Sequence, residues 1–263
     1  MEDCIDIILV ANAGVLVRAH GVGLLLDGIH HADGHPFIKV PENILECMKL
    51  GEEPYSGIDY LLFTHEHPDH FTPELVLDQV RHRPVKGIFL PDEEEGTPAL
   101  RHLYSHLREQ GIPYWPLGLE AGEVRKFQPE PGLQITAIGA RHMGPQFQDV
   151  RNDCFLVSIN GMNLLFTGDA DHVGEYFERA VKDVPIEAVF VNPIFYHNPE
   201  GQAVINEIIN PRKVAIYHLP QKQNDPMHLH FTVKRAMQRY AHPAVCIHVL
   251  TEENPGFRLN FSE

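Results

Sequence analysis

A short loop in the first third of the chain concentrates residues that bind transition metals. It reads His65-Glu66-His67-Pro68-Asp69-His70 and directly follows the apolar stretch 58–63. In an extended segment, side chains two positions apart point the same way, so His65 and His67 can hold one ion together. Pro68 then turns the chain and presents Asp69 and His70 at a different angle, close enough to hold a second ion beside the first. The loop therefore predicts a site for two metal ions.

Two ions need more ligands than this loop contains, because each takes about three protein ligands in addition to a shared oxygen. In α/β proteins, functional loops follow the ends of strands. Three residues meet this condition: His142 after the stretch 133–138, Asp169 after a hairpin that ends at 166, and His218 after the stretch 214–217. His228 and His230 lie only a short loop beyond His218, so a contribution from either of them stays open.

Apolar patterns and turn signals predict the elements that position these residues. Strands are expected over 5–10, 15–17, 22–27, 58–63, 85–90, 133–140, 155–159, 162–166, 188–191, 214–217 and 245–249. Helices are expected over 43–50, 72–81, 97–110, 175–182, 202–209 and 232–240. Asn160-Gly161 is a strong hairpin signal between two of the strands. Hairpins followed by βα units occur twice, which predicts two similar halves within a single domain, 1–263.

Composition and charge exclude several classes of protein. The chain has 263 residues, 21 Lys and Arg against 36 Asp and Glu, and a net charge of −15, which disfavours nucleic acid as a partner. No apolar run approaches a membrane span, and the start of the chain is acidic where a secretory signal would be basic. Four scattered cysteines suit a reducing compartment. We therefore expect a cytoplasmic protein with a small-molecule substrate and no membrane partner, and homo-oligomerisation stays open.

The order of these motifs resembles the metallo-β-lactamase superfamily: an H-x-H-x-D-H loop, a later His, a later Asp and a final His, over essentially the whole chain. The resemblance implies an α/β (α+β) fold, a four-layer αββα sandwich made of two similar halves. It also implies a ligand set for a binuclear site. One metal would be held by His65, His67 and His142, the other by Asp69, His70 and His218, and Asp169 would bridge both together with a hydroxide.

Two such ions polarise the bond to be attacked and acidify bound water, so the implied reaction is hydrolysis. Asp69, Asp169 and His218 are assigned to catalysis as well as to metal binding. Imidazoles and carboxylates suit Zn²⁺ best and also accommodate Mn²⁺ or Fe²⁺. Position 67 is His and not the Glu that resembles the di-iron oxygen-reductase branch, which disfavours redox chemistry.

Three branches of the superfamily are disfavoured. True β-lactamases resemble secreted proteins with a cysteine ligand and no histidine at the position of His70, and the RNA-processing branch needs a long insertion between the positions of Asp169 and His218. Glyoxalase II relatives carry a C-terminal helical domain, which we do not expect here. The strings Asn12-Ala13-Gly14 and Leu24-Leu25-Leu26-Asp27-Gly28 are similar to proteins related to L-ascorbate-6-phosphate lactonase. We expect a small, anionic ester, lactone or phosphodiester as substrate, contacted by Tyr196, His197 and His230. The alternatives are a nuclease or cyclic-phosphodiesterase relative and a non-catalytic metal-binding regulator.

Overall fold

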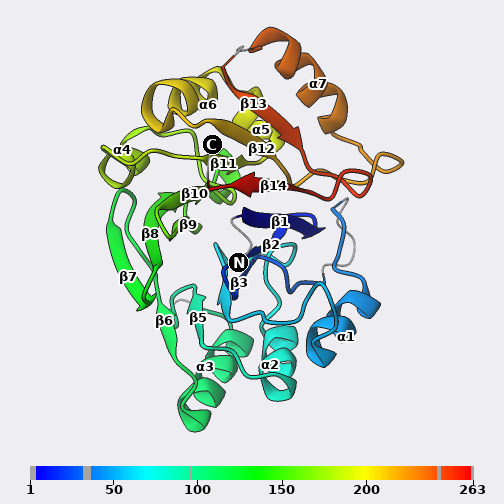
Figure 1. The fold of residues 1–263 in the computed structure, drawn as a ribbon, viewed down its shortest axis with the longest axis vertical. Helices are drawn as coiled ribbons and strands as arrows, with labels where there is room; N and C mark the ends of the chain where they lie inside the picture. The colour runs from blue at the N-terminus through cyan, green and yellow to red at the C-terminus, as the bar shows by residue number, and fades with distance from the viewer. Residues whose placement is uncertain (1–3, 32–36, 95, 242–243, 262–263) are drawn as a thin grey trace. The chain divides into compact units, whose positions relative to one another are not determined.

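The computed structural model describes residues 4–31, 37–94, 96–241 and 244–261. The chain forms two compact units. The first comprises the residues up to Leu117 together with those from Glu252 onward, and the second comprises Gly118–Thr251. Each unit contains one seven-stranded mixed sheet and its own helices (Figure 1). The expected α/β class, with two sheets flanked by helices, is confirmed, whereas the interpretation of 1–263 as one domain stays a prediction.

The sheet of the first unit has the strand order β14-β1-β2-β3-β4-β5-β6. Its strands are β1 (Cys4–Ala11), β2 (Gly14–Ala19), β3 (Val22–Leu26), β4 (Tyr60–Leu62), β5 (Gly87–Leu90), β6 (Tyr114–Pro116) and β14 (Gly256–Asn260). Pairing is antiparallel from β14 to β3 and parallel from β3 to β6. The carboxyl ends of β3 and β4 therefore meet at one edge, where Asp27 and the loop after β4 begin.

Three helices cover this sheet: α1 (Glu42–Leu50), α2 (Pro73–His82) and α3 (Pro98–Gln110). Their apolar faces pack with the strands in one core, in which Leu61, Val76 and Leu103 are fully buried. The sequence fits α3 at both ends, since the Thr97 hydroxyl accepts a hydrogen bond from Leu100 N and Gly111 adopts the left-handed conformation that ends a helix. The packed helix α2 fixes the far end of the histidine loop.

The sheet of the second unit has the order β13-β12-β11-β10-β9-β8-β7. Its strands are β7 (Val124–Glu130), β8 (Leu133–Arg141), β9 (Arg151–Ile159), β10 (Met162–Phe166), β11 (Ala188–Val191), β12 (Lys213–Ile216) and β13 (Cys246–Val249). Strands β7 to β10 pair antiparallel and β10 to β13 pair parallel. Asn160 and Gly161 both have positive φ in the β9–β10 turn, so the predicted hairpin is confirmed.

The helical segments of the second unit are η1 (Pro145–Phe147), α4 (Glu175–Val181), α5 (Pro193–His197), α6 (Pro199–Ala203), η2 (Val204–Ile209) and α7 (Leu229–Arg239). The helix predicted over 202–209 begins earlier, at Pro199, and becomes π-helical at Val204. Strands β6, β7 and β14 and helix α5 were not predicted. Strand β7 is half polar and β14 depends on pairing with β1, which lies at the other end of the chain. Within the described residues, no helix is both long and apolar enough to cross a lipid bilayer.

The carboxyl group of Asp153 lies in the interior of the second unit. Asp153 on β9 is 2% exposed and faces Gly139 across the sheet. Burial raises the pKa of Asp153 to about 7, an effect partly offset by hydrogen bonds from the backbone of Leu119 and Gly118 and by the charge of Arg151. Asp153 is therefore protonated in the folded chain at pH values where it is ionised in the unfolded chain.

The substitution Asp153→Asn is expected to change how stability depends on pH. A folded-state pKa above the unfolded value gives a stabilisation that is complete below about pH 4 and is lost as pH rises through about 7. The Asn variant lacks this loss, so its Tm should exceed that of the wild type increasingly from pH 5 to pH 7 and level off above. Thermal unfolding across this range measures the difference. A Tm difference that does not change with pH would contradict the assignment.

Candidate metal centre

The histidine loop of the first unit connects β4 to α2 and is largely buried. His65, Asp69 and His70 are each at most 5% exposed, and His67 is half-buried. The backbone N–H groups of His70 and Phe71 both donate to His67 O, at 3.0 and 2.9 Å, which makes the turn after Pro68 tight. The His65 ring centroid lies 4.6 Å from that of His67 and 4.2 Å from that of His70. The loop thus gathers its metal-binding atoms as the spacing predicts.

A buried carboxylate, Asp27, fixes this loop. It follows β3, is 1% exposed and has a φ of 43°, which is rare for a residue other than glycine. Asp27 Oδ1 accepts a hydrogen bond from Thr64 N at 2.8 Å, and Oδ2 accepts from Thr64 Oγ1 at 2.7 Å and from His70 Nδ1 at 2.9 Å. One carboxylate therefore holds both the start of the loop and its last imidazole.

These hydrogen bonds also set the tautomers of two histidines. Because the Thr64 hydroxyl donates its hydrogen to Asp27, it accepts from His65 Nδ1, 2.9 Å away. His70 likewise uses its Nδ1–H for Asp27. In both rings Nε2 then carries the lone pair, which is the form of imidazole that binds a metal. Asp69 is positioned separately, because Asn12 Nδ2 donates to Asp69 O at 2.9 Å and approaches Oδ2 at 3.4 Å.

The second unit brings its three predicted ligands together. His142 follows β8, Asp169 follows β10, and His218 lies two residues after β12; each is at most 6% exposed. Asp169 Oδ2 lies 3.4 Å from His142 Nε2 and 3.6 Å from His218 Nε2. Two imidazole nitrogens thus converge on one carboxylate oxygen, at separations that leave room for a shared cation.

Three polar groups hold this second cluster in place. Met143 O accepts from His142 Nδ1 at 2.7 Å, so His142 also presents Nε2 toward the cluster. Asn192 Nδ2 donates to Asp169 Oδ1 at 3.0 Å, and Asn152 Oδ1 accepts from Asp169 N at 2.9 Å. Asn192 is also the N-cap of α5, where its Oδ1 accepts from Phe195 N. The residue that caps α5 therefore also orients the carboxylate of Asp169.

The donor atoms of both clusters are of the types that bind divalent transition metals. Buried imidazoles whose Nδ1 atoms are engaged, together with carboxylates held by asparagines, are the ligands and supporting groups that Zn²⁺, Mn²⁺ and Fe²⁺ sites use. Four of the predicted ligands belong to the first unit and three to the second. Sequence reasoning missed the groups that orient them, which are Asn12, Asp27, Asn152 and Asn192. Asp27 and Asn192 directly follow β3 and β11. Their position at the ends of strands was the one sequence feature that could have indicated a role near the site.

The remaining predicted residues lie in the second unit. His228 is exposed, and His230 Nε2 lies 2.8 Å from Pro220 O, whereas His218 faces Asp169. Tyr196 is buried on α5, and its hydroxyl has no hydrogen-bond partner among the described residues. Burial, followed by the nearby Tyr240, raises the pKa of Tyr196 to about 12, so this hydroxyl stays a donor. His197, at the end of α5, is exposed and lines a cavity. The substrate-contact role of Tyr196, His197 and His230 stays a prediction.

The family model described as "Beta-lactamase superfamily domain" matches residues 43–250, so the chain belongs to this family. No curated protein matches the sequence. Solved structures share the fold at low identity. CmlA, a diiron β-hydroxylase from Streptomyces venezuelae, has a TM-score of 0.61 and 17% identity over 97% of this chain, which spans 54% of that one. Igni18, a metallo hydrolase from Ignicoccus hospitalis, has a TM-score of 0.61 and 16% identity over 98% and 99% of the two chains.

A third structure, described as a possible metal-dependent hydrolase from Veillonella parvula, has a TM-score of 0.63 and 13% identity over 97% of this chain and 98% of that one. At these identities the similarity establishes the fold. The family assignment and the two His/Asp clusters together define a metallo-β-lactamase-fold protein with residues suited to metal binding.

Asp27→Ala is expected to weaken metal binding by about 10- to 100-fold, because His70 and the Thr64 segment lose the carboxylate that orients them. Competition with a chromophoric chelator measures the affinity without reference to activity. The exposed Asp149→Ala serves as the matched control and should bind metal as the wild type does. Equal affinities for the Asp27 variant and the wild type would show that Asp27 does not orient the site.

Proposed function

We propose that the chain is a binuclear metal-dependent hydrolase of small anionic esters, lactones or phosphodiesters. His65, His67 and His142 hold one ion, Asp69, His70 and His218 hold the other, and Asp169 is shared by both. Zn²⁺ is the proposed metal, with Mn²⁺ or Fe²⁺ as alternatives. The proposal extends to a branch similar to ascorbate-6-phosphate lactonase and to a cytoplasmic location. The second point is supported by Cys4, Cys47, Cys154 and Cys246, which form no disulfide with one another.

The observation that carries the proposal is the shared orientation of the buried imidazoles. His65, His70 and His142 each engage Nδ1 with a neighbouring oxygen, which leaves Nε2 as the binding atom. Fixing three tautomers in this way has no evident value for packing. It is instead the usual arrangement around histidines that bind a metal. The assignment of the remaining ligands is part of the proposal and is supported by the order of the motifs along the chain, which resembles that of the metallo-β-lactamase superfamily.

When bound, the ions would supply Lewis acidity and would lower the pKa of a coordinated water toward neutrality. The chain's own residues would then position charge and protons. Asp169 Oδ1 is held by Asn192, so Oδ2 stays directed at the two imidazoles of its cluster. Asp69 is held by Asn12, which places its carboxylate to accept a proton from the attacking water.

For the substrate, we propose contacts from Tyr196, His197 and His230. Tyr196 supports this because a buried, protonated hydroxyl without a partner among the described residues is available as a donor. The net charge of −15 favours a small substrate over a nucleic acid. Bound cations would allow an otherwise acidic protein to attract an anionic substrate.

Asp169→Asn is expected to reduce the metal content from about two ions per chain to at most one and to abolish hydrolysis, since a neutral amide is a poor bridging ligand. Elemental analysis after dialysis measures the metal, and a panel of esters, lactones and phosphodiesters measures turnover. Asp149→Asn, an exposed position, is the matched control. Wild-type protein without transition metal, or an Asp169 variant that keeps both metal and activity, would refute the proposal.

The same panel separates the alternatives. Turnover confined to single-stranded RNA or cyclic nucleotides would favour a nuclease or cyclic-phosphodiesterase function. Metal-loaded protein that turns over none of the substrates would favour a metal-binding regulator.

A further inference from the structure

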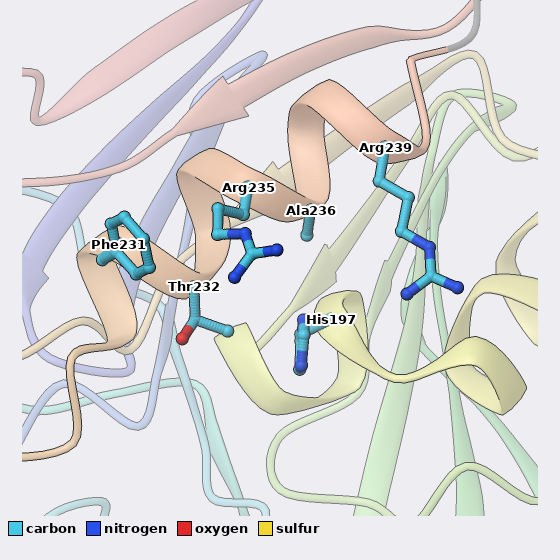
Figure 2. Close-up of a pocket in the computed structure, with 6 residues that line it drawn as sticks. All are labelled: His197, Phe231, Thr232, Arg235, Ala236 and Arg239. Carbon is cyan, nitrogen blue, oxygen red and sulfur yellow. The ribbon is translucent and has the colours of Figure 1, made fainter.

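A cavity of about 290 Å³ lies between α5 and α7 in the second unit. It is lined by His197, Phe231, Thr232, Arg235, Ala236 and Arg239. Figure 2 shows Arg235 and Arg239 extending from α7 toward the segment that carries His197. None of the metal-ligand candidates lines this cavity, and it is large enough for a small ligand.

The two arginines are unusual in their charge environment. Arg235 and Arg239 are one helical turn apart, a spacing at which like charges repel each other. Helix α7 also contains Lys234 and has no acidic residue, although the chain as a whole carries a charge of −15. Within the part of the chain that the structure describes, neither arginine forms an ion pair with a carboxylate. Two cations held together on one cavity wall, without an anionic side chain, favour an anionic ligand.

Aromatic rings, rather than carboxylates, orient the two guanidinium groups. Arg235 Cζ lies 5.8 Å from the centroid of the Phe231 ring, and Arg239 Cζ lies 5.1 Å from that of Tyr240. Stacking of this kind limits the side-chain rotamers and leaves the N–H donors available for hydrogen bonds. The Thr232 hydroxyl and an N–H of the His197 ring add further donors to the same cavity.

The cavity also has an apolar side. The apolar lining residues are Phe231, which is 60% exposed, and Ala236. Two more large apolar residues, Ile194 on α5 and Met227 just before α7, are 41% and 45% exposed and lie outside the cavity lining. Phe231, Ile194 and Met227 are three of the four exposed large hydrophobic residues that the described part of the chain contains, the other being Leu50. A ligand that joins an anionic group to an apolar or aromatic group would satisfy both sides.

We infer that this cavity binds an organic phosphate, a phosphomonoester with an apolar or aromatic substituent. Two forked guanidiniums, a hydroxyl and an imidazole offer more donors than the two oxygens of a carboxylate can use, whereas a phosphomonoester presents three terminal oxygens. The phosphate would bind Arg235 and Arg239, and the substituent would lie against Phe231. His197 is also one of the proposed substrate contacts, so this inference shares that residue with the proposed function. Arg235 and Arg239, which would bind the phosphate, belong neither to the metal-ligand candidates nor to the proposed substrate contacts.

Phenyl phosphate is a suitable probe, and isothermal titration of the full chain at its native metal content measures its binding. Arg235→Gln combined with Arg239→Gln should weaken binding by at least about tenfold, because each charged hydrogen bond is lost. Arg179→Gln, an exposed arginine on α4, is the matched control and should bind as the wild type does. Asp169→Asn should also keep the binding, which distinguishes this cavity from the metal centre.

Two further comparisons test the ligand class. Phe231→Ala should lower the affinity for phenyl phosphate and leave that for inorganic phosphate nearly unchanged, and benzoate should bind more weakly than phenyl phosphate. Unchanged affinity in the double arginine variant, loss of binding in Asp169→Asn, or no binding by wild-type protein at millimolar phenyl phosphate would each overturn the inference.

Discussion

The buried carboxylate of Asp27 is the interaction on which the first cluster depends. An ionised carboxylate away from water is stable only if its oxygens are hydrogen-bonded, and Asp27 receives the Thr64 backbone N–H, the Thr64 hydroxyl and His70 Nδ1. The same bonds connect the end of β3 to the loop after β4 and fix two imidazole tautomers. The parallel pairing of β3 with β4 brings these groups to one edge of the sheet. The strand pairing that forms the sheet therefore also places Asp27 where it can orient the ligand candidates His65 and His70.

In the second cluster, the ligand candidates are oriented by amide side chains and a backbone carbonyl instead of by a carboxylate. Asn152 and Asn192 hold Asp169 from its backbone N–H and from Oδ1, and the Met143 carbonyl holds His142. These supporting groups are neutral and leave Asp169 Oδ2 directed at the imidazoles of His142 and His218. Each unit carries its ligands on loops that follow strands of a mixed sheet, and helices packed on that sheet keep the loops in place.

Most of the secondary-structure elements and the metal-ligand candidates could be predicted from the sequence, because short motifs and apolar patterns mark them locally. The H-x-H-x-D-H spacing, the Asn160-Gly161 turn and the apolar strands before His142, Asp169 and His218 gave the cluster residues and most of the elements. Strand β14 could not be predicted, because it forms only by pairing with β1 far away in the chain. The orienting roles of Asp27 and the asparagines depend on contacts across 17 to 57 positions, which spacing does not reveal. The cationic wall of the α5–α7 cavity likewise required the structure.

The central proposal is that the His and Asp ligand candidates hold two divalent metal ions. Anomalous diffraction from crystals of the metal-loaded protein, collected at the absorption edge of the bound metal, tests it most directly. The account predicts two metal peaks per chain, close enough to share one ligand. A single peak, or two peaks too far apart to share a ligand, would contradict it.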